Sequence, residues 1–178
     1  MDLGCGVGRI ATLIPNNINC YYGLDFSEEF IIIAQQNFQD NSNFFLHNID
    51  IANFQDCTAI QGKKFNMVFI VGILIYLNDV VIENIFTNLL KFFNQTEPLQ
   101  LYIRESMSLL DTRLTLDDFY SNNLESNYSA IYRTDQEYKD LFKIFEPIGL
   151  RLSKEELFPE TLGNNTETRQ KFYIFKRE

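Results

Sequence analysis

The sequence of 178 residues contains no tryptophan, one histidine and three cysteines. Cys5, Cys20 and Cys57 are odd in number, and their spacing matches no metal-binding motif. We therefore expect reduced thiols, no metal site and a cytoplasmic protein, because disulfides persist mainly in oxidising compartments. His47 falls inside an expected strand, and we interpret it as a structural histidine rather than a catalytic base.

Basic residues are also few. Fifteen lysines and arginines against 24 aspartates and glutamates give a formal net charge of −9. A nucleic-acid-binding surface needs a basic stripe to displace counterions, so we expect no nucleic-acid partner. The apolar run at residues 65–77 is interrupted by Asn66 and Gly72 and is too short to cross a bilayer, so we expect no membrane span.

Large apolar residues are abundant instead. Seventeen phenylalanines and nine tyrosines contribute to a hydrophobic content of 46%, which is typical of a globular domain with a substantial core. No repeat or linker divides the chain, so we expect residues 1–178 to form one domain.

Strand-like and helix-like segments alternate along the chain, which predicts an α/β fold with a mostly parallel sheet and helices on both faces. The last two expected strands are predicted to be antiparallel neighbours. Residues 106–134 interrupt the alternation, and their polar and aromatic content predicts a substrate-facing insertion with short helices. The expected strands are residues 20–24, 44–48, 65–71, 99–103, 150–157 and 171–175, and the expected helices are residues 7–13, 27–37, 78–92 and 134–145.

The chain opens on a glycine-rich turn with Gly4, Gly6 and Gly8 at alternate positions. Such a turn between a strand and a helix lets backbone amides approach a ligand closely. The pattern differs from the dinucleotide fingerprint GxGxxG, because the third glycine arrives one residue early and is followed by Arg9. This difference argues against a nicotinamide-dependent oxidoreductase.

Three acidic residues stand at the ends of successive expected strands: Asp2, Asp25 and Asp50. The carboxyl ends of parallel strands lie at the same edge of a sheet, so these carboxylates are predicted to point into one crevice. An acid about 20 residues after the glycines commonly binds ribose hydroxyls. The alternative interpretation is structural: Asp25 caps the helix that begins at Ser27, and Asp50 ends a strand in a turn.

The segments Asp2-Leu-Gly-Cys-Gly-Val-Gly8, Gly23-Leu-Asp-Phe-Ser27 and Asn48-Ile-Asp50 together resemble the cofactor motifs of class I S-adenosylmethionine-dependent methyltransferases. The resemblance covers residues 1–145. It implies a Rossmann-like doubly wound sheet, S-adenosyl-L-methionine as cofactor, and methyl transfer to an oxygen or nitrogen of a small molecule or glycan precursor.

The resemblance also implies which residues bind the cofactor. Asp2 and the glycine turn hold the methionine half, Asp25 binds the ribose, and Asp50 with Ile51 frames the adenine. Cys5 is interpreted as a small residue that fills the turn, and no catalytic residue is assigned. The full expected set is Asp2, Gly4, Cys5, Gly6, Gly8, Asp25, Phe26, Asp50, Ile51, Val71 and Gly72.

The acceptor is expected to enter near the ends of the fourth and fifth strands. Two or three arginines near one pocket suit a carboxylate or phosphate, so an anionic acceptor is one expectation. The alternative for residues 104–106 is an ordinary salt bridge at a strand end. The candidate substrate-binding residues are Tyr76, Arg104, Glu105, Tyr120, Tyr128, Tyr132 and Arg133.

Further stretches, at residues 72–79, 102–106, 113–116 and 128–134, are similar to a methyltransferase subgroup associated with bacterial surface polysaccharides, in which a capsule phosphoramidate is one suggested acceptor. Two other functions stay open. The chain could be a catalytically silent cofactor-binding partner of another subunit, or, less in keeping with the glycine pattern, a nicotinamide-dependent oxidoreductase.

In this family the strand before the glycine turn lies centrally, between the second and fourth strands. Only Met1 precedes Asp2 here, so most of the first strand is missing from this chain. We expect the sequence to be an N-terminally shortened form of a longer protein. An equally sharp and stable thermal transition with and without upstream residues would contradict that expectation.

Overall fold

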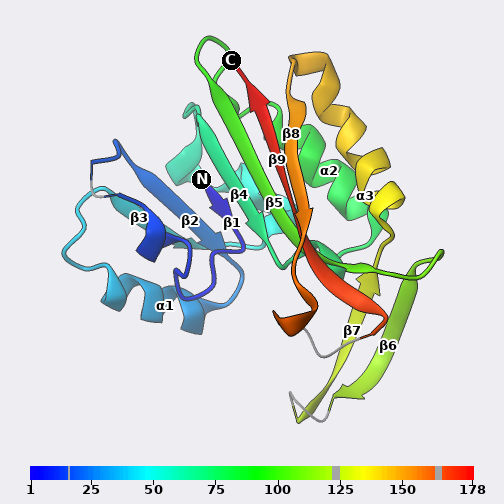
Figure 1. Ribbon diagram of the computed structural model, residues 1–178. Helices are drawn as coiled ribbons and strands as arrows, with labels where there is room; N and C mark the ends of the chain where they lie inside the picture. The colour runs from blue at the N-terminus through cyan, green and yellow to red at the C-terminus, as the bar shows by residue number, and fades with distance from the viewer. Residues whose placement is uncertain (16, 122–124, 163–165) are drawn as a thin grey trace.

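The computed structural model describes residues 1–15, 17–121, 125–162 and 166–178 (Figure 1). The described residues form a seven-stranded sheet in the order β3-β2-β1-β4-β5-β9-β8, and a separate two-stranded sheet, β6-β7. The strands are β1 (Asp2–Leu3), β2 (Tyr21–Asp25), β3 (Phe44–Asn48), β4 (Met67–Val71), β5 (Leu99–Ser108), β6 (Leu114–Ser121), β7 (Ser126–Tyr132), β8 (Arg151–Leu157) and β9 (Thr168–Arg177). The α-helices are α1 (Glu28–Asn37), α2 (Asp79–Leu89) and α3 (Asp135–Phe142), with short 3-10 helices η1 (Ala11–Leu13), η2 (Ile51–Asp56), η3 (Thr58–Ile60), η4 (Leu74–Tyr76), η5 (Lys143–Ile148) and η6 (Glu160–Leu162).

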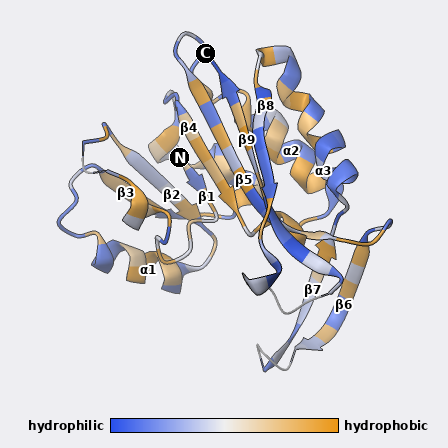
Figure 2. Ribbon diagram, viewed as in Figure 1, coloured by the Kyte–Doolittle hydropathy of each residue, from blue (hydrophilic) through white to orange (hydrophobic). Residues whose placement is uncertain are grey.

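The sheet has helices on both faces, as predicted. Strands β1 to β5 are parallel to one another, and β9 is antiparallel to both β5 and β8. Helix α1 packs on one face through Ile31 and Ala34, and α2 and α3 cover the other face (Figure 1). Figure 2 shows hydrophobic residues along β4 and β5, the middle of the main core.

Local sequence signals fix two of the helix starts. Ser27 accepts a hydrogen bond from the amide of Phe30 at the start of α1. At the start of α3, Thr134 and Glu137 form a reciprocal capping box, as the sequence predicts. Both caps satisfy backbone amides that have no partner inside the helix.

Strand β1 is only two residues long, and it lies between β2 and β4 as predicted. Asp2 is paired with Gly23 of β2 and with Phe69 of β4. A groove of about 460 Å³ adjoins the start of β1 and is lined by the segments that lead into β2 and β4, including Cys20, Tyr21 and residues 64–67.

The helix predicted at residues 7–13 is absent, and only the three residues of η1 are helical there. Gly8 has a φ of +88°, which no right-handed helix accommodates. Ile14, which precedes Pro15, is extended, as residues before proline usually are. The residues between these two points are too few for an α-helix.

The prediction of short helices at residues 106–134 is also wrong. β5 continues to Ser108, and β6 and β7 then form an antiparallel hairpin that extends away from the body of the sheet (Figure 1). Apolar residues alternate along both strands of this hairpin, which is the period of a strand and not of a helix. No helix among the described residues is long and apolar enough to cross a membrane.

Candidate functional site

The glycine turn, residues 4–8, joins β1 to the segment that leads to η1. The amides of Gly4 and Cys5 both donate to the carbonyl of Leu24, at 2.8 and 3.1 Å, and tie the turn to the end of β2. Gly6 has a φ of +54°, and a Cβ added there would meet no atom within 4 Å. The turn therefore leaves open space beside a backbone that only glycine adopts without strain.

Asp2 is fully buried and only partly satisfied. Its Oδ2 accepts a 2.6 Å hydrogen bond from the hydroxyl of Tyr21. Its Oδ1 is buried and has no hydrogen-bond partner among the described residues. Burial raises the pKa of Asp2 to about 6, and the hydrogen bond from Tyr21 opposes that rise. Since a buried carboxylate oxygen without a donor is costly, a ligand that supplies a donor or a positive charge would be stabilised here.

Asp25, at the end of β2, links the glycine turn to α1. Its Oδ2 accepts from the amide of Gly6 at 2.8 Å, and its Oδ1 accepts from the amide of Ser27 at 2.9 Å. The structural alternative for Asp25 is thus present in the geometry. Each carboxylate oxygen can accept more than one hydrogen bond, so these contacts leave capacity for hydroxyl donors.

Asp50 follows β3 and begins η2. Its Oδ1 accepts from the amide of Ala52 at 2.9 Å, and its side chain is exposed. The amide of Ile49 donates to the carbonyl of Asp25 at 2.8 Å, so the ends of β2 and β3 are joined. Ile51 is buried in the main core.

Asp2 begins the two-residue strand β1, Asp25 ends β2, and Asp50 follows the end of β3 by two residues. Because β1, β2 and β3 are adjacent and parallel, the three predicted carboxylates lie toward the same edge of the sheet. Gly72, directly after β4, has a φ of +72° and also faces open space. Phe26 is 74% exposed, and Val71 is buried.

Cys5 is buried within the glycine turn. Burial, with Asp2 and Asp25 nearby, raises the pKa of its thiol. A thiol of this kind stays protonated and is a poor nucleophile, which favours its interpretation as a filler of the turn.

Glu105 does not emerge at the crevice as predicted, because β5 continues past it. Its buried Oε1 accepts from the amides of Ile73 and Leu74 at 2.8 and 3.0 Å. Burial raises the pKa of Glu105 to about 7, and the backbone amides oppose that rise. Its Oε2 has no hydrogen-bond partner among the described residues. Arg104 instead lies over the ring of Phe158, 5.9 Å from its centroid.

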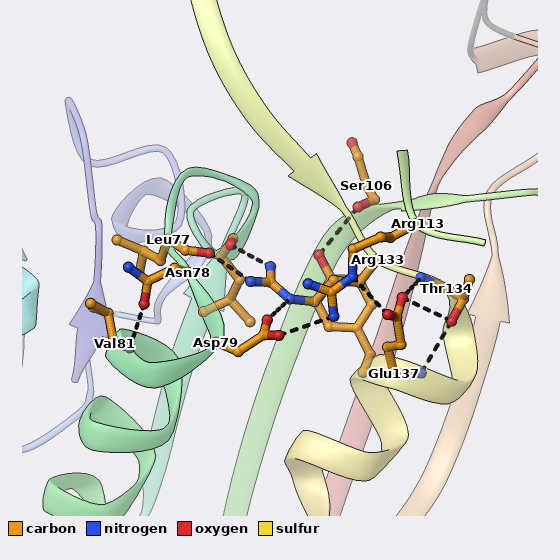
Figure 3. A network of polar contacts seen from close by, with 11 residues as sticks. Leu77, Asn78, Asp79, Val81, Ser106, Arg113, Arg133, Thr134 and Glu137 are labelled. Atoms are coloured by element: carbon orange, nitrogen blue, oxygen red, sulfur yellow. Dashed lines mark hydrogen bonds and ion pairs between the residues drawn. The ribbon is translucent and has the colours of Figure 1, made fainter. Parts of the chain in front are cut away.

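Arg133 is the centre of a polar network that joins the hairpin to α2 and α3 (Figure 3). Its Nε donates to Oδ1 of Asp79 at 2.7 Å, and its terminal nitrogens donate to the carbonyls of Leu74 at 2.9 Å and Leu77 at 2.6 Å. Arg113 bridges Asp79 at 3.0 Å and Glu137 at 2.7 Å. The guanidinium of Arg133 is 0% exposed. This placement corrects its expected role, because the side chain is fully buried and each of its three guanidinium nitrogens already donates to Asp79 or to a backbone carbonyl.

The candidate tyrosines separate into two groups. Tyr128 and Tyr132, on β7, have hydroxyl oxygens 3.4 Å apart. Tyr76 lies near Tyr128, and burial, with Glu105 and Tyr128 nearby, raises the pKa of Tyr76. Tyr120 pairs with Asn127 and, as the next residue after Phe119 in β6, faces away from Tyr128, so the structure does not place it with the other candidate substrate-binding residues. Sequence reasoning missed Tyr21, Asp79 and Arg113, because no short motif marks their long-range partners.

The comparisons with known proteins identify the family. A family model described as "Methyltransferase domain" matches residues 1–95, more than half of the chain, including β1 to α2. The chain belongs to this methyltransferase family. Among curated proteins, none matches it.

Solved methyltransferases share the fold at low sequence identity. A protein from Methanosarcina mazei, described as an S-adenosylmethionine-dependent methyltransferase, is 12% identical with a TM-score of 0.71, and the match covers 99% of this chain and 90% of that one. A methyltransferase from Leishmania major is 18% identical with a TM-score of 0.69, and the match covers 98% of this chain and 62% of the Leishmania protein. The chain therefore spans less than two thirds of the length of that protein. Magnesium protoporphyrin IX methyltransferase from Synechocystis, solved with bound S-adenosylmethionine, is 17% identical with a TM-score of 0.62, covering 99% of this chain and 68% of that one.

Proposed function

We propose that the chain binds S-adenosyl-L-methionine at the carboxyl edge of β1 to β4 and transfers its methyl group to a small molecule. The observation that carries this proposal is the unpaired, buried Oδ1 of Asp2 beside the glycine turn. The methionine half of the cofactor has an ammonium group, which is the kind of donor that this oxygen lacks.

The residues present fit the rest of the cofactor in the same way. Gly6 gives it an open backbone, whereas Gly4 lets the turn pack closely against Ile73. Asp25 accepts from the ribose hydroxyls, and Asp50 accepts from the adenine amine. Phe26 and Ile51 flank the adenosine, and Cys5 and Gly8 shape the turn. Val71 and Gly72 lie beneath the methionine and the sulfonium.

The bound cofactor supplies an electrophilic methyl group, so the chain needs mainly to hold the acceptor in line and to exclude water. An acceptor amine must only be unprotonated, whereas a hydroxyl group needs a base within hydrogen-bond reach. The acceptor atom, oxygen or nitrogen, and the surface-polysaccharide subgroup stay predictions. None of the structures named above is described as acting on a polysaccharide.

A calorimetric titration with a matched pair of variants tests cofactor binding. Gly6 and Gly62 have φ values of +54° and +71°, and both face open space. Alanine should cost each turn about 1 kcal/mol of stability. Gly6→Ala should also weaken S-adenosylmethionine binding by about tenfold or more, because its methyl group enters the cofactor site. Gly62→Ala should bind like the parent.

Equal affinity of the two variants would contradict the proposed site. Binding of NAD in place of S-adenosylmethionine would favour an oxidoreductase. Cofactor binding without release of S-adenosylhomocysteine in the presence of any candidate acceptor would favour the silent partner subunit.

A further inference from the structure

The β6–β7 hairpin carries a continuous apolar and aromatic stripe on one face. In the hairpin register Leu114 is opposite Tyr132, Leu116 is opposite Ala130, and Phe119 is opposite Tyr128. We call these six residues the hairpin stripe. Its inner part packs against Ile75 of η4, so the hairpin is fixed to the segment that follows Gly72.

The outer part of the hairpin stripe is not covered. Phe119 is 51% exposed, and its ring meets that of Tyr128 edge-on at 6.1 Å. Tyr76, at the end of η4, is 60% exposed. Burial raises the pKa of both Tyr76 and Tyr132, and neighbouring tyrosines raise them further. These hydroxyls therefore stay neutral at physiological pH, beside flat rings that are open to solvent.

The charges around the hairpin stripe oppose an anionic ligand. Residues 104–133 contain three arginines and no lysine. Arg133 is fully buried, Arg113 is paired with two carboxylates, and Arg104 lies over Phe158. Asp117 and Asp118 are exposed on the same hairpin, and strands β6 and β7 contain no lysine or arginine, so an acidic group on the acceptor would meet like charge there.

We propose that Tyr76, Phe119 and Tyr128 bind the methyl acceptor, and that the acceptor is a flat, aromatic-type ring without an acidic group. This inference rests on the proposed function, which places the methyl group beside Gly72, four residues before Tyr76. It replaces the expectation of an anionic acceptor. Tyrosine rings favour a neutral or cationic ring through stacking and cation–π contact.

Three probes with the same phenol ring test the charge preference: tyramine, p-cresol and 4-hydroxyphenylacetate. Their binding to the protein loaded with S-adenosylhomocysteine is measured by saturation-transfer NMR. We expect tyramine to bind about tenfold more tightly than 4-hydroxyphenylacetate, with p-cresol between them.

Two neighbouring residues of β6 give a matched pair of variants. Phe119 belongs to the hairpin stripe. Tyr120 is also exposed, but it pairs with Asn127 and lies on the opposite face of the hairpin. Phe119→Ala should weaken tyramine binding by about threefold to tenfold, and Tyr120→Ala should leave it unchanged. Both changes are at the surface, and thermal melts of the two variants confirm that each is folded.

Tighter binding of the anionic probe, equal effects of the two variants, or no binding of any probe at millimolar concentration would overturn the inference. Calorimetry with S-adenosylhomocysteine on the same samples separates this failure from failure of the proposed function. If that ligand does not bind, the proposed function fails, and the three probes are then compared on the unloaded protein.

Discussion

The charged groups at the two ends of the sheet's carboxyl edge differ in how completely they are paired. At the β1–β3 end, Asp2 keeps an unpaired buried oxygen and Asp50 is exposed. At the hairpin end, Arg133 and Arg113 both bind Asp79, and Arg133 also donates to two backbone carbonyls. A buried polar atom without a hydrogen-bond partner at this edge indicates a ligand site. Charged groups that are fully paired with one another indicate a role in holding the fold together.

Glu105 lies between these ends and shares both properties. Its Oε1 is satisfied by two backbone amides, while its Oε2 is unpaired. A buried charge can therefore stabilise the fold, stabilise a bound ligand, or lower the stability of the fold. The predictions below separate these three cases.

The largest effect is expected for Arg133→Met. This change leaves the carbonyls of Leu74 and Leu77 without their donor, while Asp79 keeps its contact with Arg113. It should cost about 3–5 kcal/mol of unfolding free energy, because each buried acceptor without a donor costs about 1–3 kcal/mol and the packing of the guanidinium is also lost. Arg133→Lys should lose less, because an ammonium group can still reach some of these acceptors. Arg104→Met, which removes only a contact with the ring of Phe158, is the control. Urea unfolding measures all three, and similar losses for Arg133→Met and Arg104→Met would contradict the structural role.

Glu105 should make stability fall as the pH rises. Its pKa is about 7 in the folded state against an ordinary value of 4.5. The folded protein therefore binds more protons than the unfolded chain between pH 4.5 and 7, and about 3 kcal/mol of stability should be lost across that window. Glu105→Gln keeps an oxygen for the amides of Ile73 and Leu74 and should flatten this part of the curve. If the stability of Glu105→Gln falls with pH as steeply as that of the parent, another group causes the pH dependence.

The local part of the fold could be predicted, and the long-range part could not. The Ser27 cap and the capping box at residues 134–137 depend on residues three positions apart, so the sequence shows them directly. The helix expected at residues 7–13 does not form because Gly8 has a positive φ. The sequence alone does not show whether a glycine adopts a positive φ or is accommodated within a helix. The pairing of Arg133 with Asp79 joins residues 54 positions apart, which a single sequence does not reveal.

The candidate site follows the same rule. The edge shared by Asp2, Asp25 and Asp50 follows from parallel topology alone, so it could be predicted. The hydrogen bond from Tyr21 to Asp2 could not, because it depends on which face of β2 each tyrosine occupies. Strands β6 and β7 were likewise not predicted, because polar and aromatic residues are mixed in this segment and do not give a clear strand pattern.

Asp2→Asn tests the proposed ligand site at the other end of the edge. The pKa of Asp2 is about 6, and only its ionised form attracts an ammonium group. S-adenosylmethionine affinity should therefore rise as the pH passes through about 6 and fall again as the ammonium group of the ligand loses its proton, at about pH 8. The variant should bind about tenfold to a hundredfold more weakly at pH 7, without the rise at about pH 6.

The smallest effect is expected for Asp50, where the structural and ligand-binding interpretations can be separated. Asp50→Ser retains a side-chain oxygen that can accept from the amide of Ala52, so stability should change by only a few tenths of a kcal/mol. The carboxylate is lost, and cofactor affinity should fall by about threefold to tenfold because one hydrogen bond to the adenine amine is weakened. Asp50→Ala removes both functions and should lose about 1 kcal/mol of stability as well. Calorimetry and urea unfolding on the two variants give the answer: if Asp50→Ser binds the cofactor as tightly as the parent, Asp50 is a cap and nothing more.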